Sequence, residues 1–201
     1  MVKNISSKKI IIIGSSGFVG KSCVQIFKKN KIKFISTNSK KCNLLNKKSY
    51  SYLNKIVENG DTVLFISAIA PCKNLVDFKK NIQMLYPLLN LQNKIKLSKI
   101  LYISSDAVYA DTRNKINEKS KADPNSLHGL MHLTRENLLK IYFKDILTII
   151  RPTLIYGPLD SHNGYGPNQF ARLAKKNKLI KIFGKGEEIR DHIYIDDVAR
   201  I

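Results

Sequence analysis

Short apolar runs alternate along the chain with stretches whose apolar residues recur at helical spacing. The first run, at 10–13, consists of four isoleucines without a polar face, which is typical of a strand buried on both faces of a parallel sheet. After it the period becomes helical, with one apolar face made of Val19, Cys23, Ile26 and Phe27. The pattern therefore predicts a buried strand followed directly by a helix.

The same alternation continues through residue 150. Further buried strands are predicted at 33–36, 62–66, 99–104 and 146–150. Helices are predicted at 47–58 after the cap residue Asn46, at 75–91 with a kink at Pro87, and at 126–143. Strands that alternate with helices in this way predict an α/β fold with a doubly wound, parallel, Rossmann-like sheet.

Beyond Arg151 the pattern changes, because glycines and prolines interrupt it. They are Gly157, Pro158, Gly164, Gly166 and Pro167. A short helix capped by Asn168 is predicted to run through residue 178, and short strands are predicted at 179–183 and 192–195.

The last predicted helix begins at Asp196 and Asp197, and the chain end at Ile201 cuts it short. We therefore expect a truncated chain, in which a dinucleotide-binding domain at 1–152 is followed by the start of a small C-terminal substrate lobe at 153–201.

Three glycines at three-residue spacing join the first strand to its helix. Gly14 permits a tight turn, Gly17 lets the backbone approach a pyrophosphate, and Gly20 lets helix and strand pack closely. The N-terminus of the helix adds free N–H groups and the positive end of a dipole. This context predicts a dinucleotide site, and a glycine-rich turn without a ligand is the alternative.

The end of the second strand bears on which dinucleotide binds. Rossmann sites usually place a carboxylate there, which holds the hydroxyls of the adenosine ribose. Here residues 36–41 read STNSKK and offer hydroxyls, Asn38 and two lysines but no carboxylate. That composition favours a ribose 2′-phosphate, and hence NADP over NAD.

Charge and composition narrow the set of partners. The formal net charge is +20, but only six of the 35 basic residues are arginines, and the lysines are scattered over every segment. Proteins that read bases or clamp phosphates favour the planar guanidinium of arginine. We therefore interpret the lysines as solvated faces that can attract anionic small substrates, and we expect no nucleic-acid partner.

The sequence also bears on the compartment. No apolar run approaches the ~18 residues of a membrane span, and the N-terminal apolar segment is too short for a signal peptide. We therefore expect a cytoplasmic chain without a membrane partner. Cys23, Cys42 and Cys72 are odd in number and lack CxxC spacing, which predicts reduced thiols and no metal site.

Several motifs follow one another along nearly the whole chain. They are GSSGFVG at 14–20, NLLN at 43–46, FISA at 65–68, Asn81, SSDAVY at 104–109, RPTLIYGP at 151–158, FGKGEEIRD at 183–191 and YIDDV at 194–198. In this order they resemble the extended short-chain dehydrogenase/reductases of the NAD-dependent epimerase/dehydratase family. One glycine motif alone would be a weak indication, whereas several motifs in register are a strong one.

The resemblance implies both an activity and a set of cofactor contacts. The activity is the oxidation of a sugar carbon by hydride transfer to a nicotinamide, after which many members epimerise, dehydrate or reduce. The implied cofactor contacts are Gly14, Ser16, Gly17, Phe18, Val19, Gly20, Asn38, Asn43, Leu44, Ser67, Ala68, Asn81, Ser104, His132 and Pro152.

The resemblance also implies the catalytic groups. A hydroxyl that loses hydride must lose its proton as well, so a base is needed. The family places there the tyrosine of a YxxxK motif, whose lysine lowers the tyrosine pKa, and a serine equivalent to Ser105 that hydrogen-bonds the reacting oxygen. In this chain His128 stands where the tyrosine belongs, and His132 where the lysine belongs.

The i, i+4 spacing puts both imidazoles on one face of the helix. Four interpretations of the two histidines compete. His128 acts as the base, because an imidazole titrates near pKa 6.5 without help from a lysine. Alternatively, the site binds cofactor and substrate without turnover. The pair could also bind a metal, although no third ligand is evident, or both histidines are simply polar residues of a helix face.

The sequence therefore predicts an NAD(P)-dependent oxidoreductase, epimerase or dehydratase that acts on a sugar, with a nucleotide-linked sugar as the leading interpretation. The alternative from another class is a catalytically silent dinucleotide-binding protein, such as a sensor or a partner subunit. A small-molecule sugar or nucleotide sugar is the expected partner, and a homodimer is left open.

Overall fold

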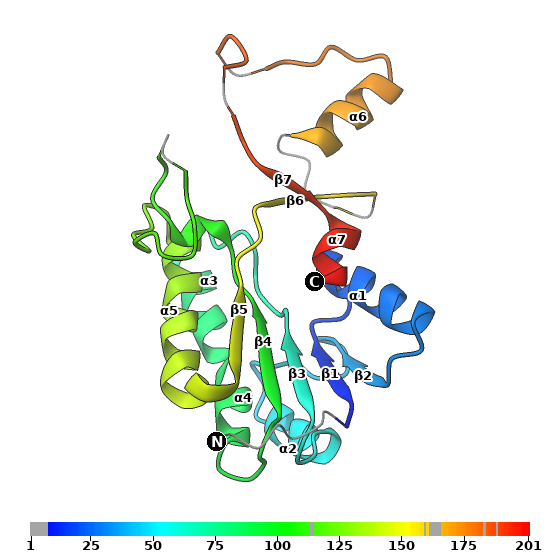
Figure 1. Cartoon of the computed structure of the whole chain (residues 1–201), viewed down its shortest axis with the longest axis vertical. Helices are drawn as coiled ribbons and strands as arrows, with labels where there is room; N and C mark the ends of the chain where they lie inside the picture. The colour runs from blue at the N-terminus through cyan, green and yellow to red at the C-terminus, as the bar shows by residue number, and fades with distance from the viewer. Residues whose placement is uncertain (1–7, 113–114, 159, 161–165, 183, 188) are drawn as a thin grey trace.

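The structure is a computed structural model that describes residues 8–112, 115–158, 160, 166–182, 184–187 and 189–201. Its centre is a five-stranded parallel sheet with the strand order β2-β1-β3-β4-β5 (Figure 1). The strands are β1 Ile10–Ile13, β2 Phe34–Thr37, β3 Thr62–Phe65, β4 Lys99–Ile103 and β5 Leu147–Ile150. The predicted α/β fold with a doubly wound parallel sheet is confirmed.

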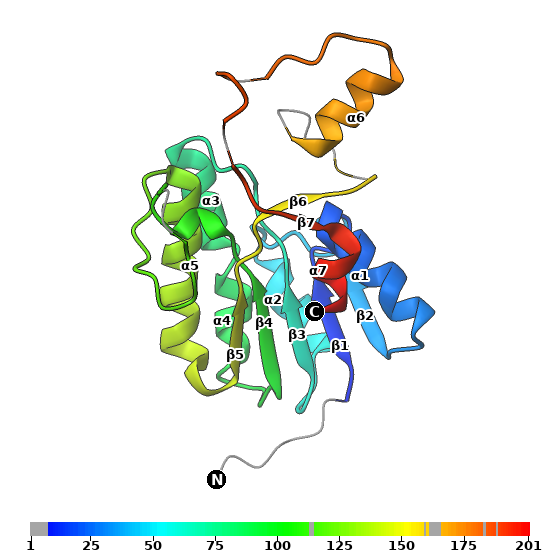
Figure 2. The same cartoon turned by 45° about the horizontal axis from the view of Figure 1, so that its top comes forward.

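Helices pack on both faces of this sheet (Figures 1 and 2). One face is covered by α1, which spans Phe18–Lys29. On the other face lie α2 Lys48–Ile56, α4 Tyr86–Leu91 and α5 Leu127–Phe143, and α3 Leu75–Gln83 packs beside α5. The chain moves from β1 to β2 on one side and later from β2 to β3 on the other side of β1, so the strand order reverses at β1.

The helix predicted at 75–91 is two helices in the structure. α3 ends at Gln83 and α4 begins at Tyr86. Pro87 lies in the first turn of α4, where the missing N–H is harmless because the first N–H groups of a helix have no intrahelical acceptor. The proline therefore belongs to the start of a second helix and does not kink a single long one.

The C-terminal region departs most from the sequence-based expectations. β6 Leu154–Tyr156 and β7 His192–Tyr194 pair in parallel as a separate two-stranded sheet. β6 was not predicted, and residues 179–182, which were predicted as part of a strand, form none. Two residues that entered the predictions here, Gly164 and Phe183, lie outside the described residues. Pairing between segments this far apart in the sequence depends on tertiary contacts that local patterns do not contain.

Two further helices complete the described chain. α6 spans Pro167–Lys175, and Asn168 does not cap it, because the Asn168 side chain accepts the Gly157 N–H at 3.2 Å. α7 spans Ile195–Arg200 and packs against α1, where the Ser22 hydroxyl donates to the Asp196 carboxylate at 3.0 Å. The domain boundary between residues 152 and 153 stays a prediction. Within the described part of the chain, no helix combines the length and apolarity needed to cross a bilayer.

Candidate active site

Most of the residues predicted to bind a cofactor gather at the carboxyl edge of the sheet. Because the strands are parallel, the segments that follow them meet at one edge. The glycine turn follows β1, and the other strands are followed by Asn38, Ser67, Ser104 and Pro152. Parallel α/β sheets bind ligands outside the carboxyl ends of the strands, at the point where the strand order reverses. Here that point lies at β1, directly below the glycine turn.

The three glycines of the turn have different surroundings. Gly14 has a φ of 107°, and a Cβ there would lie 2.7 Å from the Ser67 backbone nitrogen. A Cβ on Gly20 would overlap the Gly14 carbonyl oxygen. By contrast, a Cβ on Gly17 would meet only that oxygen, at 3.6 Å. Gly14 and Gly20 are therefore required by the fold, whereas the exposed face at Gly17 leaves room for a ligand among the described residues.

The start of α1 completes this face of the turn. Ser16 is exposed, and Phe18 and Val19 are half-buried beside it. α1 begins directly after Gly17, and no side chain caps its N-terminus. The first N–H groups of the helix are therefore free to meet an anion, where the helix dipole also favours negative charge.

The loop after β3 is held in place by Asn81, which is fully buried. The Asn81 amide accepts the Ile69 N–H at 2.9 Å and donates to the carbonyl oxygens of Ile69 and Asp77, both at 3.0 Å. The side chain is thus occupied by the protein itself and orders the segment that contains Ser67 and Ala68. Its direct contact with a cofactor stays a prediction.

The segment after β2 is organised by asparagine side chains. Asn38 accepts the N–H groups of Lys40 and Lys41, and Asn43 accepts the N–H of Leu45. Leu44 is buried, whereas both lysines are exposed. Next to this segment lies a groove of about 510 Å³, which we call the basic groove, lined by Ser39, Lys40, Lys41, Cys42, Asn43, Asn46, Lys48, Ser49, Ser51, Tyr52 and Lys55.

Ser105 follows β4 and begins a short 3₁₀ helix, Asp106–Val108. Its hydroxyl accepts the Ala107 N–H at 3.1 Å and lies 3.2 Å from the Asp106 carboxylate, to which it donates. The Asp106 N–H donates to the Pro152 carbonyl at 3.1 Å, which joins this turn to the segment after β5. Ser105 is half-buried, so its hydroxyl is positioned at the edge of the sheet without being sealed inside.

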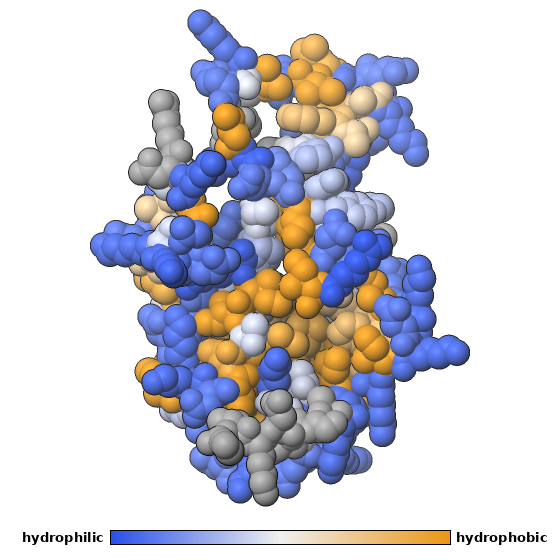
Figure 3. All heavy atoms as spheres, viewed as in Figure 1, coloured by the Kyte–Doolittle hydropathy of each residue, from blue (hydrophilic) through white to orange (hydrophobic). Residues whose placement is uncertain are grey.

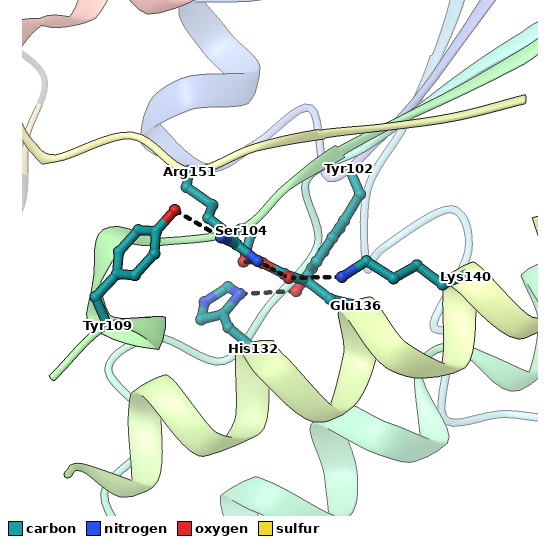
Figure 4. Close-up of polar contacts among 7 residues, drawn as sticks. All are labelled: Tyr102, Ser104, Tyr109, His132, Glu136, Lys140 and Arg151. Carbon is teal, nitrogen blue, oxygen red and sulfur yellow. Dashed lines mark hydrogen bonds and ion pairs between the residues drawn. The ribbon is translucent and has the colours of Figure 1, made fainter. Parts of the chain in front are cut away.

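A buried carboxylate ties α5 to the ends of β4 and β5 (Figure 4). Glu136 accepts the Ser104 hydroxyl at 2.6 Å and two N–H groups of Arg151 at 2.9 and 2.6 Å. Arg151 also donates to the Tyr109 hydroxyl at 2.6 Å. The hydrogen bond to Glu136 raises the pKa of Arg151. Such a bidentate, charge-assisted pair fixes the relative positions of the elements that carry it.

The two histidines lie on the first half of α5, with ring centroids 4.7 Å apart and planes nearly perpendicular, at 89°. His128 is half-buried, and its Nδ1 accepts the Cys72 backbone N–H at 3.3 Å. His132 is 4% exposed, and its Nδ1 lies 2.7 Å from the Tyr102 hydroxyl (Figure 4). The described residues contain no cluster of three metal-ligating side chains, so the structure supplies no third ligand to this pair.

Burial keeps both imidazoles neutral. Desolvation lowers the pKa of His128, against the opposing effect of the Asp106 charge. The pKa of His132 falls to about 2, mainly through desolvation and then through the positive charges of Arg135 and His128. The pKa of Tyr102 rises to about 12, again mainly through burial. At neutral pH the pair therefore consists of two uncharged rings, one of them backed by an un-ionised phenol.

Arg135 is a buried cation in the same region. It is 0% exposed, and its guanidinium lies 4.9 Å from the ring centroid of Phe65 and 5.2 Å from that of Tyr102. One nitrogen donates to the Ser67 carbonyl at 2.8 Å, while Nε and Nη1 have no hydrogen-bond partner in the described chain. Desolvation lowers the pKa of this group.

Sequence reasoning assigned no role to Tyr102, Arg135 or the Glu136–Arg151 pair. One signal was present, because Arg135 and Glu136 are adjacent charges inside a helix whose other neighbours are largely apolar. Buried charges of this kind are expected to be paired or functional. The partners themselves lie on β3 and β4 or in the segments that follow β3, β4 and β5, so no local pattern could identify them.

Comparison with known proteins gives relatives over nearly the whole chain. An uncharacterised UDP-glucose epimerase of Bacillus subtilis is 26% identical over 226 residues, which cover 96% of this chain and 70% of the relative. A dTDP-D-glucose 4,6-dehydratase of Dictyostelium discoideum is 29% identical and covers 96% of this chain, which spans 54% of that relative.

Solved structures show the same likeness. The NAD complex of a UDP-glucuronic acid 4-epimerase from Bacillus cereus has a TM-score of 0.80 at 25% identity, covering 96% of this chain and 71% of that one. The ADP-L-glycero-D-manno-heptose-6-epimerase of Helicobacter pylori, at 23% identity, shares the fold with a TM-score of 0.80 over 100% of this chain and 73% of its own. The NAD dependent epimerase/dehydratase family model matches residues 10–201. This chain therefore belongs to the NAD-dependent epimerase/dehydratase family.

Proposed function

We propose that this chain binds a nicotinamide dinucleotide at the carboxyl edge of the sheet and acts on a nucleotide-linked sugar by hydride transfer, as an epimerase, dehydratase or reductase. The observation that carries the proposal is the open face at Gly17, next to the uncapped N-terminus of α1. That face accommodates a pyrophosphate and offers it N–H donors. A bound nicotinamide would supply the hydride acceptor or donor.

The residues of the chain itself would position the cofactor and the sugar. Ser67 and Ala68 follow β3, the neighbour of β1, and Pro152 follows β5 at the same edge of the sheet, where the nicotinamide half of the cofactor is expected. Ser105 holds the reacting oxygen of the sugar by a hydrogen bond. His128 takes the position of the family's tyrosine and faces the substrate, and His132 takes the position of its lysine and faces the ribose.

For the cofactor we propose a preference for NADP over NAD. The support is the basic groove, in which Lys40 and Lys41 follow β2 and Lys48 and Lys55 belong to α2. Four ammonium groups near the adenosine end favour an additional phosphate on the ribose. Titration of both cofactors by calorimetry tests this, and tighter binding of NAD would contradict it.

Gly17→Val tests the binding site itself. The valine would fill the approach of the pyrophosphate, so cofactor affinity should fall by more than roughly tenfold, or about 1.4 kcal/mol. The fold should persist, because a Cβ at residue 17 meets only one atom, at 3.6 Å. Lys29→Val, at the far end of α1, serves as the matched control. Equal affinity for wild type and Gly17→Val would contradict the proposal.

A second function is favoured by one specific observation. His128 Nδ1 is occupied by the Cys72 N–H, and the pKa of His132 is lowered to about 2. Neither ring is then poised to take a proton from a hydroxyl, which fits a protein that binds dinucleotide and sugar without turnover. Conversion of a panel of nucleotide sugars in the presence of NAD or NADP separates the two functions, because binding alone is common to both.

A further inference from the structure

The hydrogen bond from Cys72 determines which nitrogen of His128 carries the proton. A backbone N–H can only donate, so the Nδ1 atom that receives it at 3.3 Å must present a lone pair. In a neutral imidazole the proton then lies on Nε2. Cys72 is 4% exposed, and its neighbour Asn74 caps α3, so the donor is held by the fold.

The contact between Tyr102 and His132 leads to the same tautomer by a different route. Tyr102 is fully buried and its hydroxyl lies 2.7 Å from Nδ1. A phenol is a much stronger acid than a neutral imidazole, and an imidazole nitrogen is a much stronger base than a phenolic oxygen. The hydroxyl therefore donates to Nδ1, and the imidazole proton lies on Nε2.

We infer that the fold holds both imidazoles as neutral Nε2–H tautomers, so that the pair presents two N–H donors to the oxygens of a bound ligand. Among the described residues, neither Nε2 atom has a hydrogen-bond partner. In Figure 4 the second ring nitrogen of His132 points away from Tyr102, toward the side on which Tyr109 lies. The donors are thus left for a ligand.

Burial is the main cause of the neutral state of both rings, and the charged groups around the pair modify it. Asp106, on the turn after β4, favours a charged His128, whereas burial opposes it more strongly. Arg135 and the neighbouring ring both oppose a charge on His132. Protonation of both rings would place two cations side by side, with ring centroids 4.7 Å apart.

The tautomers restrict the role of the two histidines in catalysis. This consequence rests on the proposed function. For His128 to act as a base at Nε2, its proton would have to move to Nδ1, where the Cys72 N–H already points. The pair is therefore a set of hydrogen-bond donors, suited to a sugar carbonyl or hydroxyl oxygen and to the ribose hydroxyls. It holds and polarises these oxygens and does not remove a proton. A hydroxyl oxidised in the proposed function would therefore give its proton to another group, for which the Asp106 carboxylate, 3.2 Å from the Ser105 hydroxyl, is the candidate.

Nuclear magnetic resonance of the full chain with 15N-labelled histidine tests the inference without any ligand. His128→Gln and His132→Gln assign the two rings. Each should show the long-range 15N–1H pattern of the Nε2–H tautomer at neutral pH, and His132 should keep it down to about pH 5, whereas an ordinary imidazole titrates near 6.5. An Nδ1–H pattern at either ring, or a titration of His132 between pH 6 and 7, would overturn the inference.

Tyr102→Phe removes the hydroxyl while it keeps the aromatic ring. His132 should then populate both tautomers, while His128 keeps the Nε2–H form because its donor is a backbone amide. Tyr142→Phe, on the outer surface of α5, removes a hydroxyl elsewhere and should leave both spectra unchanged. A His132 spectrum unaffected by Tyr102→Phe would overturn the inference for that ring. Failure of the proposed function would instead appear as absent NAD and NADP binding in calorimetry, with the tautomers intact.

Discussion

The two faces of the central sheet are covered very differently. On the face of α2, α4 and α5, most apolar side chains are fully buried, among them Ile100, Leu88 and Leu139. On the face of α1 and α7, the apolar cluster has four buried members, Ile12, Cys23, Leu64 and Ala199, and its other members are only half-buried. We call these the closed face and the open face.

The open face is visible as an apolar patch. Figure 3 shows apolar side chains gathered over the strands of the sheet, to the left of α1 in the same view. The half-buried members of the open face include Ile66, Leu101 and Ile103, which follow or belong to β3 and β4. The free energy that burial contributes to stability is roughly proportional to the apolar area removed from water. The closed face should therefore supply most of the stability. The polar site groups of α5, which pack on this face, should be held rigidly.

The largest expected effect comes from a matched pair of isoleucines on β4. Ile100 is fully buried on the closed face, whereas Ile103 is half-buried on the open face. Ile100→Ala should lower the free energy of unfolding by about 2–5 kcal/mol, because it leaves a cavity that neighbours cannot fill. Ile103→Ala should cost less than half as much. Urea unfolding measures both, and equal losses would show that the open face is covered in solution.

An intermediate effect is expected from the carboxylate buried in the closed face. Glu136→Gln leaves Arg151 without its bidentate partner, so the free energy of unfolding should fall by about 1–3 kcal/mol. Glu118→Gln, at an exposed position, is the control and should be neutral. Thermal unfolding of the two variants measures the difference. Equal melting temperatures would mean that the Glu136 network positions side chains without stabilising the fold.

Near neutral pH the smallest effect is expected from a pH dependence that originates in the closed face, and this effect grows as the pH falls. The pKa of His132 is about 2 in the folded chain and about 6.5 when unfolded, so the unfolded chain binds the proton first. The stabilisation is complete above pH 6.5 and is lost as the pH falls, by up to ~1.4 kcal/mol per pH unit. His128 acts in the same direction, since burial lowers its pKa too.

His132→Gln should remove this one-proton slope from the unfolding free energy measured between about pH 6.5 and 4. The matched control is His192→Gln, because His192 is exposed on β7 and contributes no buried ring. An unchanged slope in His132→Gln would mean that its ring is protonated in the folded chain.

Part of the site could be predicted from the sequence, because the motifs that form it each span only a few residues. Gly14 and Gly17 lie in the turn and Gly20 in the first turn of α1, so their separate requirements follow from the backbone of this short segment. Ser105 was recognisable from its motif, and the structure places it as the cap of a short helix. The Glu136–Arg151–Tyr109 contacts join three elements, so their existence depended on how α5 packs on the sheet.

The sequence by itself determined the alternation of strands and helices up to residue 150, the parallel sheet and the edge at which the candidate site lies. These follow from the period of apolar residues and from glycine, which act over a few neighbouring residues. The tertiary structure alone decided that Ile100 is sealed and Ile103 is not, that Leu154–Tyr156 pairs with His192–Tyr194, and that each imidazole faces a donor at Nδ1. Burial, strand pairing and tautomer all depend on partners far away in the chain, and such partners meet only when the whole domain packs.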